Sequence, residues 1–132
     1  MNEVVADTHS LIWFLFDPSR LSTPAAAALN AAATSTIHLS AISLVELAYL
    51  IDKGRLTDVA LDLLIQAVDD PARGIVLAPV DPPVARAVRR VPRRLVPEMP
   101  ARIIAATALH LGLPLVTADQ QIRAAGTVTT IW

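Results

Sequence analysis

Short apolar runs alternate with longer stretches of helical periodicity along the whole chain. Runs rich in β-branched residues predict strands at 3–7, 36–39, 75–78, 115–117 and 127–131. Apolar positions at helical spacing predict helices at 8–16, 24–33, 43–53, 57–68, 82–90, 102–111 and 119–125, and the proline-rich stretch 91–100 predicts a loop. Strands that alternate with helices are typical of βαβ units. The pattern therefore predicts an α/β fold, a doubly wound sandwich around a mainly parallel sheet of about five strands.

The composition is unusually apolar for a chain of this length. The 132 residues suit one domain spanning 1–132, long enough to bury a single core. Hydrophobic residues make up 54% of the chain against 17% charged, which favours an additional buried face such as a dimer or partner interface. No apolar run approaches the roughly 18 residues that span a bilayer, and no basic residues precede the apolar run 11–16 as they do in a signal peptide. We expect a cytoplasmic protein with no membrane segment.

Three acidic residues fall where the predicted elements would bring them to one edge of the sheet. Asp7 ends the first strand, Asp119 follows the fourth strand, and Glu46 lies in the first turn of the third helix. Ligands of open parallel sheets bind beyond the carboxyl ends of the strands, so this edge is the expected site. The chain has no cysteine and its three histidines are scattered, so oxygen ligands dominate. The pattern indicates Mg²⁺ or Mn²⁺ rather than zinc.

Each of these acids also has a purely structural interpretation. Asp7 and Asp119 each precede a predicted helix and are suitable N-cap residues. Glu46 lies three residues after Ser43, the spacing of a capping box in which the glutamate returns to the serine N–H. Capping and metal binding are compatible, because carboxylates gather at helix N-termini for both reasons.

Charge is divided unevenly along the chain. Residues 1–85 hold ten acids and four bases, whereas residues 86–132 hold two acids and seven bases, all of them arginine. Arginine recognises phosphate through its planar fork, and clustered carboxylates that hold magnesium suit phosphodiester hydrolysis. We therefore expect Arg93, Arg94 and Arg102 to contact the backbone of a nucleic acid. The alternative is a solvated, arginine-rich surface loop.

Four segments of the chain resemble the successive blocks of a PIN-domain ribonuclease. They are Val4–Thr8, Ser43–Leu47, Arg102–Ala108 and Leu115–Asp119. More narrowly, the chain is similar to the VapC toxins of type II toxin–antitoxin modules. The resemblance implies a Mg²⁺- or Mn²⁺-dependent endoribonuclease that cuts structured RNA such as tRNA or rRNA, forms a homodimer and is inhibited by a cognate VapB-type antitoxin. It also implies that Asp7, Glu46 and Asp119 are metal ligands and that Thr117 is a supporting hydroxyl.

The chain departs from the family pattern at Ala101. Family members usually carry an aspartate immediately before the block that here begins at Arg102, and alanine offers no ligand. Glu98 is the nearby acid that could substitute, although Met99 and Pro100 intervene. Loss of one carboxylate should weaken metal affinity and the positioning of water, so we expect this chain to cleave poorly or not at all. Ala101 is either an engineered knockout or the mark of a natural, weakened paralogue.

Two functions from other classes remain to be weighed against a nuclease. One is a catalytically inactive PIN-like module that binds an antitoxin or RNA, which predicts no divalent metal at Asp7, Glu46 and Asp119. The other is a phosphoacceptor receiver domain, which also places acids at strand ends. A receiver requires a lysine late in the chain, and the only lysine here is Lys53.

Overall fold

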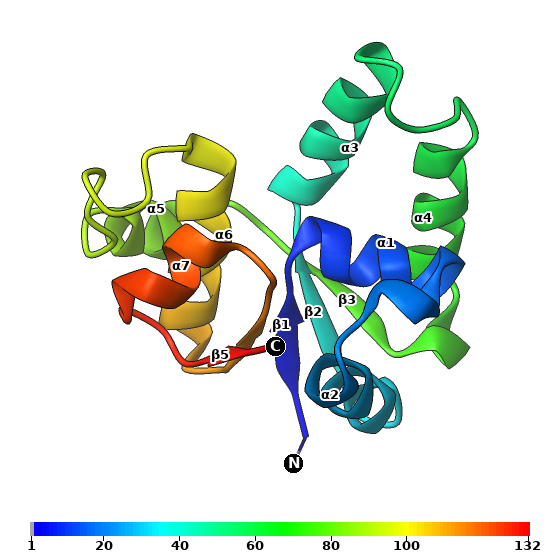
Figure 1. Ribbon diagram of the computed structural model, residues 1–132, viewed down its shortest axis with the longest axis horizontal. Coiled ribbons are helices and arrows are strands. Elements are labelled where there is room, and N and C mark those ends of the chain that lie inside the picture. Colours follow the sequence, from blue (N-terminus) through cyan, green and yellow to red (C-terminus); the bar gives the residue numbers. More distant parts are fainter. Residues whose placement is uncertain (1) are drawn as a thin grey trace.

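A wholly parallel, five-stranded sheet forms the centre of the computed structural model, which describes residues 2–132 (Figure 1). Its strands are β1 (Val4–Ala6), β2 (Ile37–Ser40), β3 (Ile75–Ala78), β4 (Leu115–Val116) and β5 (Thr130–Ile131). They lie in the order β3-β2-β1-β4-β5, and every neighbouring pair is parallel. The chain thus builds outward from β1 in one direction and then in the other. This confirms the predicted α/β fold and places a topological switch point at β1.

Seven α-helices cover the sheet in the described part of the chain. They are α1 (Thr8–Phe16), α2 (Thr23–Ala33), α3 (Ile42–Asp52), α4 (Ala60–Asp69), α5 (Pro82–Val88), α6 (Met99–Leu111) and α7 (Gln120–Ala125). The predicted start of α1 at Thr8 is confirmed, as is the end of α6 at Gly112, which adopts the left-handed conformation. The Ser22 hydroxyl caps α2 by accepting from Ala25 N at 3.1 Å.

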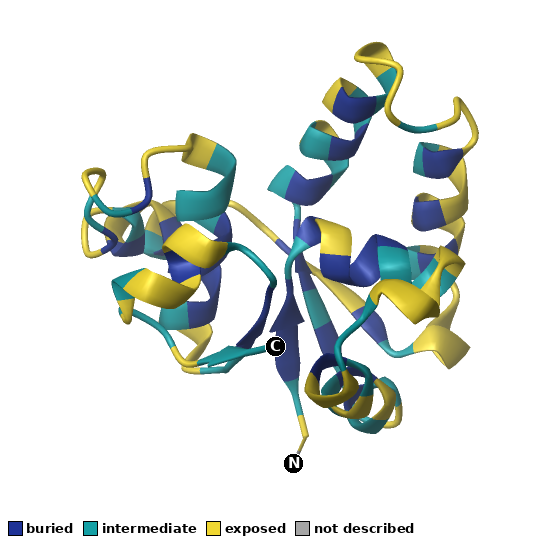
Figure 2. Ribbon diagram, viewed as in Figure 1, coloured by how far each residue is buried: buried dark blue, intermediate teal, exposed yellow. Residues whose placement is uncertain are grey.

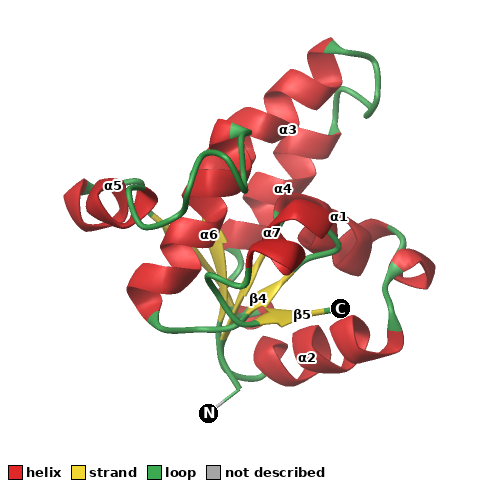
Figure 3. Ribbon diagram, turned by 60° about the vertical axis from the view of Figure 1, so that its left-hand side comes forward, coloured by secondary structure: helices red, strands yellow, loops and turns green. Residues whose placement is uncertain are grey.

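The helices form two layers, one on each face of the sheet (Figure 3). Successive residues of a strand point to opposite faces, so Val4 and Ala6 of β1 pack into one core with α1, α2 and α4. Val5 packs into the second core with α5, α6 and α7. All three residues are buried, and Figure 2 shows the central strands as the most buried part of the molecule. β1 therefore carries no polar side chain until it leaves the sheet at Asp7.

The helix α6 begins three residues earlier than predicted. It starts at Met99, whereas the sequence indicated a loop as far as Pro100. Proline fits the first turn of a helix because the N–H that it lacks would have no helical partner there. Ala101 therefore lies in the first turn of α6 and is not in a preceding loop. Four other helix starts also differ from prediction, since α2 begins at Thr23, α3 at Ile42, α4 at Ala60 and α7 at Gln120.

Among the glycines, Gly74 comes closest to another part of the chain, at the point where the chain enters β3. Its φ is +69°, and a Cβ built on it would lie 2.5 Å from the carbonyl oxygen of Ala33 at the end of α2. This approach lets the Gly74 carbonyl accept from Ile37 N at 2.8 Å and sets the register of β3 against β2. Among residues 2–132, no helix has the length and apolar character needed to cross a membrane.

Candidate active site

Asp7 and Asp119 meet at the carboxyl end of the sheet through Thr117. Asp7 follows β1 directly, and Thr117 follows β4, the strand paired with β1. The buried Thr117 hydroxyl donates to Asp7 Oδ2 at 2.6 Å and accepts from Asp119 N at 3.0 Å. The predicted supporting hydroxyl thus links the two acids, one through its side chain and the other through its backbone. Their proximity follows from two adjacent parallel strands that end at the same edge.

Glu46 joins this edge through a chain of buried hydroxyls from another part of the sequence. Thr8 Oγ1 donates to Glu46 Oε1 at 2.6 Å and lies 2.7 Å from Ser43 Oγ. Thr8 has a single hydroxyl proton, which it donates in the hydrogen bond to the Glu46 carboxylate. In the contact between the two hydroxyls, Ser43 is therefore the donor and Thr8 the acceptor. Thr8 and Ser43 are each at most 1% exposed. The result is a proton-ordered chain that runs from Ser43 through Thr8 to Glu46 and fixes α3 against the start of α1.

The surroundings of Asp7 disfavour a charge on its carboxyl group. Burial raises the pKa of Asp7 above its ordinary value of 3.8, and the negative charge of Glu46 raises it further. Hydrogen bonds from the Thr117 hydroxyl and the Thr8 N–H oppose this rise. The ionised form of Asp7 is therefore destabilised by its surroundings and would be favoured by a nearby cation.

The capping interpretations have different outcomes. Asp7 is the N-cap of α1 and accepts from Thr8 N at 2.7 Å. Asp119 is the N-cap of α7, and its Oδ1 accepts from Gln121 N at 2.9 Å and Ile122 N at 3.0 Å. The alternative of a capping box at Ser43 and Glu46 is wrong, because α3 begins at Ile42 and Glu46 instead accepts from Thr8. Glu46 is the one acid of the three whose carboxylate is held by a tertiary contact alone.

Asp119 stands between two hollows in the surface. On one side a hollow of about 310 Å³ is lined by Asp7, His9, Trp13 and Asp119, among others. On the other side a groove of about 480 Å³ runs between α3 and the start of α6, lined in part by Glu46, Glu98, Ala101 and Asp119. Within residues 2–132, no three histidine, aspartate or glutamate side chains come close enough together to hold a metal ion. The three predicted ligands share one edge of the sheet without forming a single cluster.

The arginines predicted to bind RNA occupy two different environments. Arg93 and Arg94 are exposed in the loop before α6. Arg102 instead donates from Nε to Val91 O at 3.0 Å and from Nη2 to Val88 O at 2.9 Å. Its guanidinium thereby satisfies carbonyls at the end of α5 and in the following turn, which is a structural role that sequence alone did not indicate.

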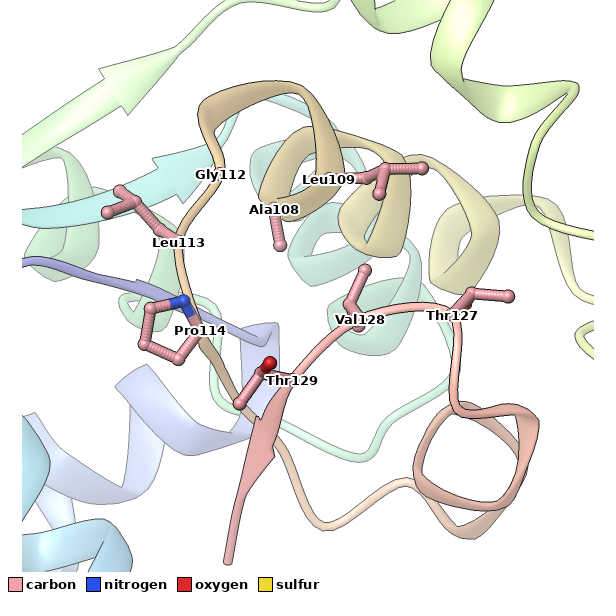
Figure 4. Close-up of a pocket in the computed structure, with 8 residues that line it drawn as sticks. All are labelled: Ala108, Leu109, Gly112, Leu113, Pro114, Thr127, Val128 and Thr129. Atoms are coloured by element: carbon pink, nitrogen blue, oxygen red, sulfur yellow. The ribbon is translucent and has the colours of Figure 1, made fainter.

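A separate pocket of about 320 Å³ lies at the opposite end of the sheet (Figure 4). It is lined by the end of α6, by Leu113 and Pro114 just before β4, and by residues 127–129 just before β5. Because these segments precede β4 and β5, the pocket lies at the amino ends of the strands, away from Asp7 and Asp119. It contains no acidic or basic side chain and is not part of the candidate site.

Sequence reasoning missed Thr8 and Ser43 as parts of the site. Thr8 connects the two acids, because its backbone N–H donates to Asp7 Oδ1 and its hydroxyl donates to Glu46, and the Ser43 hydroxyl contacts that of Thr8. The available signal was the spacing of Ser43 and Glu46, which places both on one face of a helix. The same spacing also fits a helix cap, and nothing in the sequence indicates which element packs against that face.

Comparisons with known proteins agree with this fold. The family model for the PIN domain matches residues 4–127. Ribonuclease VapC22 of Mycobacterium tuberculosis is 31% identical over 125 residues, which cover 93% of this chain and 92% of that protein. Among solved structures, VapBC2 of Rickettsia felis bound to a DNA fragment from its promoter has a TM-score of 0.71 at 15% identity, covering 97% of this chain and 96% of that one. The VapBC-5 complex of M. tuberculosis has a TM-score of 0.65 at 21% identity, with 98% of each chain covered.

Proposed function

This chain belongs to the PIN-domain family, and on that premise we propose that it is the VapC-type toxin of a toxin–antitoxin module, a metal-dependent endoribonuclease directed at structured RNA such as tRNA or rRNA. The observation that carries the proposal is the tertiary link between Asp7 and Glu46 through Thr8, with Asp119 beside them at the carboxyl edge of the sheet. A ribonuclease named VapC22 is similar over nearly the whole chain, which supports the same activity here.

The donors at this edge suit a hard divalent cation. They are carboxylate and hydroxyl oxygens, and the destabilised charge of Asp7 beside Glu46 is what a cation would relieve. Asp7 and Glu46 would hold Mg²⁺ or Mn²⁺, with Asp119 next to them. When bound, the cation would polarise the phosphoryl oxygen and lower the pKa of the attacking water.

The chain's own hydroxyls would position these carboxylates. Thr117 holds Asp7 Oδ2, the Thr8 N–H holds Asp7 Oδ1, and the Thr8 hydroxyl holds Glu46 Oε1, so both carboxylates have a fixed orientation. Fixed orientation lowers the entropy lost when a ligand binds. We assign Thr8, Ser43 and Thr117 as positioning residues of the site.

Ala101 limits this activity. It lines the same groove as Glu46 and Asp119 and presents only a methyl group there. A site that lacks a carboxylate at this position binds the cation and orients water less well, so we propose that the chain is impaired as a nuclease. The second candidate function, an inactive module that binds RNA or an antitoxin, is favoured by the same observation.

An exposed arginine surface supports RNA as the substrate. Five arginines along α5 and the loop after it are exposed, and none of them makes a salt bridge in the described residues. They are Arg86, Arg89, Arg90, Arg93 and Arg94. Exposed guanidinium groups bind phosphates without regard to sequence. The loop that carries Arg93 and Arg94 leads directly into the helix that bears Ala101, so bound RNA would extend to the candidate site.

A second surface suits an antitoxin. A groove of about 560 Å³ between α1 and α4 is lined by Ile12, Trp13, Phe16 and Leu63, among others, with Arg20 at its margin. The side chains of Phe16 and Leu63 are 45% and 42% exposed. Apolar side chains that lie exposed together in a groove are typical of a surface that binds another protein. We propose that a VapB-type antitoxin covers this groove, that the chain forms a homodimer and that it acts in the cytoplasm.

Restoring the missing carboxylate tests the proposed reaction. The Ala101→Asp variant should cleave total RNA or tRNA with Mg²⁺ or Mn²⁺ faster than the original chain, by roughly 10²-fold or more if a few kcal/mol of transition-state stabilisation returns. Ala101→Asn is the matched control, because it has the same size without the charge. Adding Asp7→Asn or a chelator should abolish the gain. If Ala101→Asp cleaves no RNA under any of these conditions, the nuclease proposal fails and the inactive module is preferred.

A further inference from the structure

The groove beside Glu46 has an apolar wall that the proposed chemistry does not use. Its lining residues are Ile42, Val45, Glu46, Tyr49, Glu98, Pro100, Ala101 and Asp119. Acidic side chains therefore occupy part of the groove, and aliphatic and aromatic groups occupy the rest. The apolar part comes from α3 on one side and from the first turn of α6 on the other.

Tyr49 is the aromatic residue of this wall. It is 58% exposed, and Val45, one helical turn earlier on α3, is 64% exposed. An exposed aromatic face next to an open groove is a characteristic platform for the stacking of a nucleobase, because every base offers a π-face of similar size. On the opposite side of the groove, Ala101 contributes only a methyl group.

The helix α3 aligns this ring with charges on either side. Glu46, Tyr49 and Lys53 follow one another at spacings of three and four residues, so they lie along one face of the helix. At about 1.5 Å per residue, the three span about 10 Å, the rise of roughly three stacked nucleotides. The Lys53 ammonium lies 5.4 Å from the centroid of the Tyr49 ring. A carboxylate, an aromatic face and a cation thus follow in sequence, starting from the candidate site.

We propose that this face of α3 is a nucleotide-binding subsite, in which the Tyr49 ring stacks on an unpaired base next to the cleaved phosphodiester and Lys53 binds a flanking phosphate. This inference rests on the proposed ribonuclease function and adds to it a preference for a single-stranded base at one side of the cut. An RNA is favoured over a protein partner because the groove is continuous with the candidate site at Glu46 and Asp119, and because the chain's single lysine lies against the ring. In structured RNA such a base is available in loops and bulges.

Equilibrium binding tests the subsite without relying on turnover. The probe is a fluorescein-labelled RNA stem-loop, compared with the same stem-loop whose loop nucleotides lack bases, in Mg²⁺ and with the RNA verified as intact. Tyr49→Ala should weaken binding of the complete stem-loop by about 5- to 150-fold and leave binding of the baseless one unchanged. Tyr49→Phe should bind both as the original chain does. Lys53→Ala should reduce the slope of log affinity against log salt by about 0.7.

Two controls and the opposing outcomes complete the experiment. Leu111→Ala removes an exposed apolar side chain that lines neither groove and should leave RNA affinity unchanged. Arg73→Ala removes one exposed positive charge outside both grooves and should leave the salt slope unchanged. If the original chain binds the stem-loop and Tyr49→Ala binds it equally well, the subsite is wrong while the proposed function stands. If Tyr49→Ala instead changes the sedimentation of the chain with no change in RNA affinity, the face is a protein interface and the inference fails. If the original chain binds no RNA at low salt, the proposed function fails, and the subsite with it.

Discussion

Replacing Thr8 by valine would remove the hydroxyl that links α1 to Glu46 while keeping the shape of the side chain. Thr8 is 1% exposed, and its Oγ1 donates to Glu46 Oε1 at 2.6 Å. A hydrogen bond to a charged group contributes about 1.5–3 kcal/mol. Ser43, which is fully buried, would also lose the acceptor for its own proton, at about 1 kcal/mol. Because Glu46 is only half-buried and can recover some hydration, we expect a net loss of about 2–4 kcal/mol.

Urea unfolding in the presence of a chelator measures this loss without a contribution from bound metal. With a slope of about 2 kcal/mol per molar urea, the midpoint of Thr8→Val should fall by roughly 1–2 M. The melting temperature should fall by roughly 8–16 °C, at about 4 °C for each kcal/mol in a chain of this size. Thr8→Ser, which keeps the hydroxyl and loses only a methyl group, is the matched control, and its free energy of unfolding should decrease by about 1 kcal/mol.

A double-mutant cycle locates the effect. In a Glu46→Ala background, Thr8→Val should cost about 1–3 kcal/mol less than it does in the original chain, because the partner carboxylate is already gone. The reasoning would be refuted if Thr8→Val and Thr8→Ser had equal stability, or if the cost of Thr8→Val did not depend on Glu46. Either result would mean that the hydroxyl chain does not hold α1 and α3 together.

Three further changes test other parts of the structure. The pKa of Asp7 is raised in the folded chain. The protonated Asp7 carboxyl therefore contributes stability that is fully present below pH 3.8, the ordinary pKa, and is lost as the pH rises through the raised pKa. Metal-free Asp7→Asn should therefore match the original chain in acid and exceed its stability at pH 7, and a loss at pH 7 would contradict this. Arg102→Met should lower the free energy of unfolding by about 2–3 kcal/mol. Arg102→Lys should recover only part of this loss, because one ammonium cannot reach both carbonyls. A free energy of unfolding for Arg102→Met within about 0.5 kcal/mol of that of the original chain, measured by thermal unfolding, would exclude this role. Gly74→Ala should lower the free energy of unfolding by about 2–4 kcal/mol, because of its positive φ and the collision of the new Cβ with Ala33 O. The matched Gly54→Ala has a similar positive φ with no neighbour within 4 Å, so it should lower the free energy of unfolding by less.

Local pattern was enough to predict the layered fold and one pair of site residues. Alternation of strand and helix periods determined a parallel sheet, because parallel strands need crossovers. Asp7 and Asp119 each follow a strand, and parallel strands present their carboxyl ends at a common edge whichever strands are neighbours. Their meeting could therefore be inferred from the one-dimensional order of elements. The absence of a ligand at Ala101 was likewise visible in the sequence alone.

Contacts between distant elements were decided only by tertiary packing. Thr8 lies 38 residues from Glu46, and nothing in the periodicity of either helix indicates that α3 packs against the start of α1. Glu46 therefore seemed, from its local spacing, to cap its own helix. Arg102 likewise seemed available for phosphate because the carbonyls that it satisfies are 11 and 14 residues upstream.

The amino-acid sequence by itself determined which residues could supply charge and where along each element they stand. Only the tertiary structure decided which of those charges are buried, which are held by hydroxyls and which remain free. The physical reason is that hydrophobic periodicity is a property of one element, whereas desolvation and hydrogen bonding depend on the partner that covers it. Asp7 shows both, because the end of its strand places the acid, whereas burial in the folded chain raises the pKa of its carboxyl against the opposing hydrogen bonds from Thr117 and Thr8.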